Sequence, residues 1–152
     1  MRGRIILYLT ILFIWGCNPL LNSNPPDYLK QFTAYKEGDG IVVYFILADS
    51  SGQMTTCDGE ATISIRASHY DYKGELKLFE CGYPVRKENF VKTKIGMGML
   101  ERDAIVYSLG RISFQSFRYD AQGMKEKNWK GIIRFEFAGV GRIFKGEESF
   151  YF

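Results

Sequence analysis

Histidine is nearly absent from this chain and cysteine is scarce: one histidine, His69, and three cysteines occur in 152 residues. A Ser-His-Asp or Cys-His catalytic arrangement would have to use His69. A zinc site needs three or four ligands, and neither a C-x-x-C nor an H-E-x-x-H spacing occurs. The sequence therefore predicts no metal and no other cofactor, and a solvent-exposed turn histidine is the simplest interpretation of His69.

The chain also lacks an apolar run long enough to cross a bilayer. Its most apolar stretch, Ile5 to Trp15, has eleven residues, whereas a transmembrane helix needs about 20. A strong excess of one charge is missing too, because 20 Lys and Arg face 17 Asp and Glu. A net charge of +3 gives no reason to expect a nucleic-acid partner.

What is present at the N-terminus is a targeting pattern. Arg2 and Arg4 precede the apolar run, and Gly16 places a small residue before Cys17, which is the layout of a secretory signal. The order Ile14-Trp15-Gly16-Cys17 resembles the lipobox of bacterial lipoproteins. That resemblance implies cleavage after residue 16 and a fatty-acyl anchor on Cys17. The protein would then be held to the cell membrane or outer membrane, facing the periplasm or the exterior; plain secretion is the alternative.

The leader divides the rest of the chain. Residues 1–16 would be the signal peptide, and residues 17–27, rich in Asn and Pro, would carry the lipid and form a flexible tether. Residues 28–152 would form a single domain with its own core. Cleavage removes Arg2 and Arg4, so Lys and Arg fall from 20 to 18 against 17 acids, and the mature charge is about +1.

With Cys17 acylated, Cys57 and Cys81 remain as a pair in an oxidising compartment. A disulfide between them would add about 3 kcal/mol in the chain-entropy model. However, a turn at Asp71–Gly74 places Cys81 opposite Ser64 on the preceding strand. The cysteines would meet only if the strands bend or if Cys57 lies on another strand, so two free buried thiols are the alternative.

Short apolar or alternating runs, separated by Gly and Asp, predict an all-β fold. The run Ile41–Ala48 predicts a central strand buried on both faces, and the alternation over Ala61–Ala67 predicts a strand with one solvated face. Stretches 103–109 and 111–119 are expected as two strands joined at Gly110. About seven such strands predict an antiparallel β-sandwich, for which an immunoglobulin-like topology is an analogy from length and rhythm.

Some stretches allow other interpretations. Pro26–Tyr35 and Ala121–Trp129 are short segments that could be helical. The aromatic end, Ser149–Phe152, resembles the end of outer-membrane barrels, although the apolar residues on both faces of Ile41–Ala48 weigh against a barrel. The glycine pairs at 96–98 and 139–141 lack the third glycine of a dinucleotide loop and predict turns or bulges.

Candidate chemistry is weak throughout. Glycosidases need two carboxylates about 5 to 9.5 Å apart across a cleft, and the acids that could form such a pair are Asp39, Asp58, Glu101 and Asp103. Asp71 is a candidate only as a partner of His69. A small basic and aromatic cluster that could meet lipid headgroups or stack on a sugar comprises Lys125, Lys127, Trp129 and Lys130.

The sequence thus favours a lipid-anchored extracytoplasmic β-sandwich that acts without catalysis as a binding, adhesion or envelope-scaffold module. Its partners would be the membrane, through Cys17, and an unidentified protein or envelope polymer. Recognition is expected from the loops 49–58, 82–89 and 119–131. The alternatives are an envelope hydrolase with a carboxylate-based or His69-based site and a small outer-membrane barrel.

Overall fold

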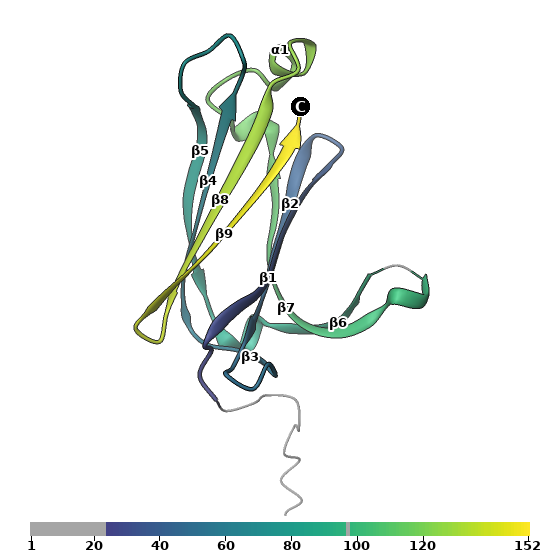
Figure 1. Cartoon of the computed structure of the whole chain (residues 1–152), viewed down its shortest axis with the longest axis vertical. Coiled ribbons are helices and arrows are strands. Elements are labelled where there is room, and N and C mark those ends of the chain that lie inside the picture. Colours follow the sequence, from purple (N-terminus) through teal and green to yellow (C-terminus); the bar gives the residue numbers. More distant parts are fainter. Residues whose placement is uncertain (1–23, 97) are drawn as a thin grey trace, which may run out of the picture.

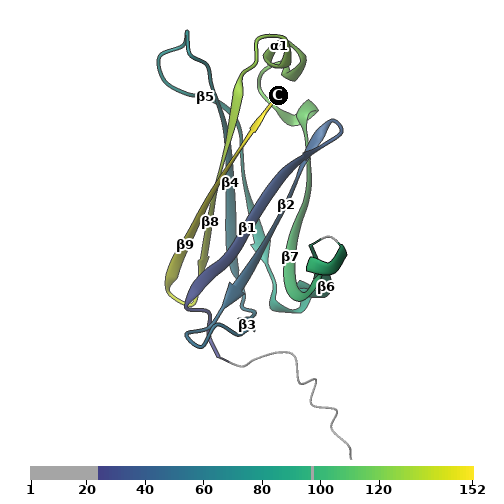
Figure 2. The same cartoon turned by 45° about the vertical axis from the view of Figure 1, so that its right-hand side comes forward.

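The computed structural model describes residues 24–96 and 98–152. The expected signal peptide, Cys17 and most of the expected tether lie outside these residues. The described chain forms two antiparallel sheets packed face to face (Figures 1 and 2). The strands are β1 (Tyr28–Glu37), β2 (Gly40–Ala48), β3 (Met54–Thr55), β4 (Gly59–Ser68), β5 (Leu76–Val85), β6 (Val91–Ile95), β7 (Arg102–Ser113), β8 (Lys130–Gly139) and β9 (Arg142–Tyr151).

The strand order confirms the expected β-sandwich. One sheet has the order β1-β2-β7-β6, with β3 paired to β2, and the other has the order β5-β4-β8-β9. If β3 is set aside and the other strands are lettered A, B, C, C′, D, E, F and G, the sheets become A-B-E-D and C′-C-F-G. That is the immunoglobulin-like arrangement with a C′ strand added to the second sheet.

Short helical turns lie in the connections. They are the 3₁₀ turns η1 (Lys87–Asn89), η2 (Gly98–Leu100) and η3 (Phe114–Ser116), and the helix α1 (Ala121–Glu126). Two segments were possible helices from the sequence. The first part of Ala121–Trp129 forms α1, whereas most of Pro26–Tyr35 belongs to the strand β1. No helix within the described residues combines the length and the apolar character that crossing a membrane would require.

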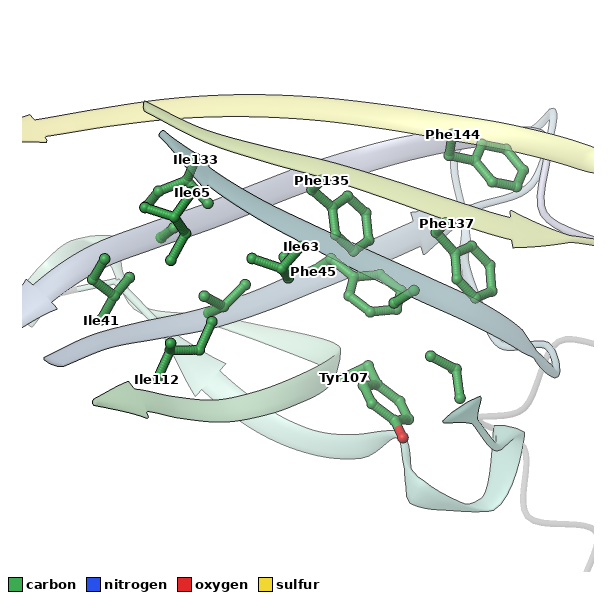
Figure 3. Packing of buried hydrophobic residues seen from close by; sticks show 14 of the residues in the cluster. Ile41, Phe45, Ile63, Ile65, Tyr107, Ile112, Ile133, Phe135, Phe137 and Phe144 are labelled. Carbon is green, nitrogen blue, oxygen red and sulfur yellow. The ribbon is translucent and has the colours of Figure 1, made fainter. Parts of the chain in front are cut away.

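The core lies between the sheets and is dominated by aromatic rings. Phe45 of β2 is fully buried, and its ring centroid lies 4.9 Å from that of Phe135 and 5.3 Å from that of Phe137, both on β8. Figure 3 shows these rings packed against one another between the layers. β2 and β8 correspond to the two strands that a disulfide joins in antibody domains, so aromatic packing takes that place here. Truncation of Phe45 to Ala would cost about 3 to 5 kcal/mol.

Strands β2 and β4 behave as the sequence predicts. β2 lies between β1 and β7, and both of its faces are largely buried. In β4 the buried residues alternate with half-buried ones from Ala61 to Ala67. The alternation arises because successive side chains of a strand point to opposite faces.

The register between β4 and β5 differs from the expectation by one residue. Cys81 pairs with Ile63, not with Ser64, because the loop after β4 runs from His69 to Glu75 and a bulge follows at Ile65/Arg66. A shift of one residue moves a side chain to the opposite face of a sheet. Turn residues alone therefore did not fix the register.

The expected disulfide is absent, because Cys57 and Cys81 are both free thiols. Cys81 lies beside Ile63, and Cys57 is six residues earlier than Ile63, or about 20 Å of extended chain. A disulfide requires Cα atoms within about 7 Å. Cys57 is buried, and that burial raises the pKa of its thiol to about 11.

A second correction concerns residues 103–119. They do not form two strands joined at Gly110: β7 runs without a turn from Arg102 to Ser113. Gly110 instead marks a bulge against β2, where Val43 pairs with Gly110 and Tyr44 pairs with Ser108. Gly110 has φ +80°, a conformation that glycine adopts without steric cost.

The first residues of the described chain are docked on the sandwich. The side chain of Asn24 donates a hydrogen bond to the carboxylate of Asp49 at 3.1 Å, and the hydroxyl of Thr55 donates to the carbonyl of Asn24 at 2.5 Å. Asp27 pairs with Arg142, and Pro26 is buried. Residues 24–27, assigned to the tether from the sequence, therefore belong to the folded body.

β3 and the β8–β9 turn lie at one end of the sandwich (Figure 1), and Asn24 is docked there. We call it the anchor end, after the anchor that the sequence leads us to expect. The opposite end holds α1 and the loop between β4 and β5. The ten residues of β4 run from one end to the other, which corresponds to about 30 Å.

Candidate functional site

Two aromatic residues from distant parts of the chain meet at the end opposite the anchor end. β4 and β8 pair up to Ser68 and Lys130, and the next residues outward are His69 and Trp129. Their rings stack with centroids 5.1 Å apart and planes at 28°. The shared register of the two strands thus creates the contact, although 60 residues separate the partners in the sequence.

The turn after α1 holds Trp129 in place. The amide of Trp129 donates to the carbonyl of Met124, and the amide of Asn128 donates to the carbonyl of Lys125, both at 3.1 Å. This is the Schellman pattern of a helix end. Asn128 has φ +52°, in the left-handed region that asparagine tolerates better than most residues. A short helix with a defined end therefore orients the indole.

The loop after β4 adds two tyrosines. The ring of Tyr70 lies 4.2 Å from that of His69, and the ring of Tyr72 lies 5.7 Å from that of Trp129. Tyr70 is 89% exposed and Tyr72 is 44% exposed. These four residues, His69, Tyr70, Tyr72 and Trp129, form what we term the aromatic cluster.

The aromatic cluster lines an open hollow of about 570 Å³ with a polar rim. Asp71 and Glu126 contribute carboxylates, Lys127 an ammonium group and Asn128 an amide. Aromatic faces beside hydrogen-bonding groups are suited to a ligand with one apolar face and several polar edges.

The polar contact of the His69 ring is structural. Its Nδ1 accepts a hydrogen bond from the backbone amide of Asp71 at 3.2 Å, so in the neutral ring the proton lies on Nε2. A backbone amide, and not a carboxylate or a nucleophile, thus engages Nδ1. The described residues contain no group of three or more His, Cys, Asp or Glu side chains that could hold a metal ion.

No family model, curated protein or solved structure matches this chain.

The acids considered from the sequence do not gather at one site. Asp39 pairs with Arg111, and the carboxylate of Asp58 accepts from the amide of Lys87 at 2.9 Å. Asp103 lies 4.0 Å from Lys92 across the β6–β7 hairpin. Each of these carboxylates has a partner that stabilises a turn or a strand pair.

The three loops expected to carry recognition lie at different ends. Residues 49–58 and the connection after β5 lie at the anchor end, whereas residues 119–131 lie at the opposite end (Figure 1). Residues 82–85 are not a loop at all, because they belong to β5. Of the basic and aromatic cluster, Lys127 and Trp129 line the hollow.

Sequence reasoning considered His69 and Trp129 separately and missed their contact. The position of each at the end of a strand was a usable signal. Their pairing depends on β4 and β8 being neighbours, which is a non-local property of the fold.

Proposed function

We propose that this chain is a lipid-anchored extracytoplasmic module that binds a saccharide of the cell envelope at the aromatic cluster. The lipid would be attached at Cys17, as the lipobox-like order of residues 14–17 implies. The partners of the protein are then the membrane at one end and an envelope glycan at the other.

The stack of His69 on Trp129, extended by two tyrosines, is the observation that carries the binding proposal. A pyranose ring presents C–H groups on its faces and hydroxyls on its edges. Aromatic faces attract the C–H groups, and the carboxylates of Asp71 and Glu126 accept hydrogen bonds from the hydroxyls. The rigid sheets beneath the loops support a preformed site.

The placement of the cluster also favours this function. Asn24 is docked on the anchor end, and the aromatic cluster lies about 30 Å away at the other end of β4. A protein anchored at its N-terminus would present this cluster away from its own membrane, toward polymers of the surrounding envelope.

Fluorescence titration tests the binding proposal. Trp129 is the only tryptophan outside the leader, so the emission of the mature protein reports on this site. Addition of soluble glycan fragments released from cell wall should change the emission with saturation. Tyr70→Ala should weaken binding roughly two- to tenfold, the value of one aromatic contact.

Tyr151→Ala is the matched control, because Tyr151 is 68% exposed but lies on β9, outside the cluster. It should bind like the wild type. Equal affinity of Tyr70→Ala and the wild type, or equal losses in both variants, would contradict a glycan site at the cluster.

A further inference from the structure

The hairpin of β6 and β7 forms an arm that leaves the sandwich sideways near its anchor end (Figures 1 and 2). The arm comprises residues 91–96 and 98–106, with pairing from Val91↔Val106 to Ile95↔Arg102. Its inner side is packed: Ile95 contacts a small cluster that contains Ile46 and Ala104. Ile95 is the last residue of β6 and lies next to the tip, so this contact holds the arm against the outer face of the five-stranded sheet.

The tip of the arm is apolar and exposed. Met99 and Leu100, in η2, have relative exposures of 103% and 83%. Two adjacent apolar side chains at the end of a projecting hairpin have no packing role within the described chain. Such exposed apolar groups mark surfaces that contact a partner or a membrane.

Charged side chains of both signs flank this tip, with a small excess of basic ones. The arm carries Lys92, Lys94 and Arg102 against Glu101 and Asp103, so its net charge is 3 − 2 = +1. Lysine and arginine near an apolar insertion interact favourably with anionic lipid headgroups. An exposed apolar tip on an arm with a small basic excess is complementary to an anionic bilayer surface.

The reach of the chain brings this tip to the membrane. Asn24 follows Cys17 by seven positions, a length of chain that spans at most about 25 Å when extended. Asn24 is docked on the anchor end, from which the arm also projects. A lipid on Cys17 therefore holds the arm within reach of the bilayer.

We propose that Met99 and Leu100 insert into the headgroup region of the bilayer that holds the Cys17 lipid, as a second membrane contact. This inference builds on the lipid anchor of the proposed function. The two contacts tilt the sandwich toward the arm and restrict the directions in which the aromatic cluster can face.

A fluorophore on the tip tests this contact in the mature lipoprotein. The substitution Leu100→Cys is made in a Cys81→Ser background, and the new thiol is labelled with an environment-sensitive nitrobenzoxadiazole group. Cys57 stays unlabelled because it is buried. The lipoprotein is reconstituted into vesicles of phosphatidylethanolamine and phosphatidylglycerol, and the mass of its Cys17 peptide reports lipidation independently.

Ile143→Cys provides the matched control. Ile143 is 64% exposed and follows the β8–β9 turn, which lies at the anchor end on the side away from the arm (Figure 1). The label at position 100 should shift to the blue and be quenched by nitroxide lipids at least about twofold more strongly than the label at 143. Unchanged melting temperatures confirm that both labelled variants are folded.

The outcomes separate the arm from the anchor. A lipidated Cys17 with an aqueous emission at position 100, or stronger quenching at 143, overturns the arm contact and leaves the anchor intact. If Cys17 proves unlipidated, the measurement is repeated with Cys17→Ser so that the label is confined to position 100. A blue-shifted emission there after vesicle addition then supports the arm, and the missing lipid contradicts the anchor. Replacing Met99 and Leu100 together with Gln should shift the emission of a label at Thr93→Cys toward the aqueous value, and an unchanged emission there counts against insertion.

Discussion

Asn24 donates a hydrogen bond to the buried carboxylate of Asp49 from 25 positions earlier in the chain. The same carboxylate accepts hydrogen bonds from the hydroxyl and amide of Ser51 and from the amide of Gln53. One side chain thus organises the turn after β2 and fixes the point at which the N-terminal segment joins the body. The orientation of any N-terminal anchor relative to the sandwich depends on this contact.

Acid should weaken the docking of residue 24 through Asp49. Hydrogen bonds from Ser51 and Asn24 lower the pKa of Asp49 from 3.8 to about 2. Because the folded pKa lies below the unfolded value, the stabilisation is full above about pH 4 and is lost as the pH falls toward 2. In urea unfolding, the free energy of unfolding of the wild type should exceed that of Asp49→Asn clearly at pH 7. This difference should shrink as the pH falls from about 4 to 2.

Gln53→Ala is the control for that titration, since it leaves the carboxylate of Asp49 in place. The difference in free energy of unfolding between this variant and the wild type should change less with pH. A difference between the wild type and Asp49→Asn that is constant from pH 5 to pH 2 would show that the carboxylate does not stabilise the fold as described.

The two thiols should differ sharply in reactivity. At pH 8 a thiol with a pKa of about 11 is about 0.1% thiolate, whereas an unperturbed cysteine is about a quarter thiolate. Iodoacetamide should therefore modify half-buried Cys81 first, with Cys57 more than about 100-fold slower than in the unfolded chain. Mass spectrometry of the alkylated peptides measures both rates.

Unfolding in urea without reductant should expose both thiols to complete alkylation. A peptide pair that resists alkylation until reductant is added would mean that the cysteines are bonded, contrary to the structure.

The turn between β8 and β9 offers a stabilising substitution. Gly139 pairs with Arg142, so Val140 and Gly141 form a two-residue turn, with φ +49° and +74°. A β-branched side chain is strained in this region, whereas Asn-Gly is the preferred sequence for such a turn. Val140→Asn should stabilise the protein by about 1 kcal/mol, measured by urea unfolding.

Val140→Ile keeps the β-branched side chain and should give no gain. A loss of stability in Val140→Asn comparable to that of an ordinary surface substitution would show that the turn is not strained at residue 140.

The sequence predicted those parts of the fold that local patterns encode. The apolar run of Ile41–Ala48 and the alternation over Ala61–Ala67 were sufficient for β2 and β4, because burial on one or two faces sets the spacing of apolar residues. The prediction of two strands joined at Gly110 was wrong, since a glycine with positive φ occurs in a bulge within a strand as well as in a turn between strands. The predicted register of Cys81 was also wrong, because the length of the loop that begins at His69 and a bulge together determine the register.

The candidate site was harder to predict from the sequence than these strands. Neither the position of His69 nor that of Trp129 reveals that β4 and β8 are neighbours, and the stack exists only through that pairing. Strand order depends on contacts between residues far apart in sequence, which a single sequence does not show. The arm was likewise hidden, because the exposure of Met99 and Leu100 is a property of the folded hairpin.

Fatty-acid labelling of Cys17 tests most directly the claim that this is a lipid-anchored module. Cells that express the full chain are grown with radioactive palmitate, and the wild type is compared with Cys17→Ala and with Cys81→Ala as a control cysteine. A lipid anchor at Cys17 predicts label in the wild type and in Cys81→Ala, and an unlabelled, uncleaved precursor in Cys17→Ala. Label that persists in Cys17→Ala, or a wild type that is cleaved without label, would contradict it.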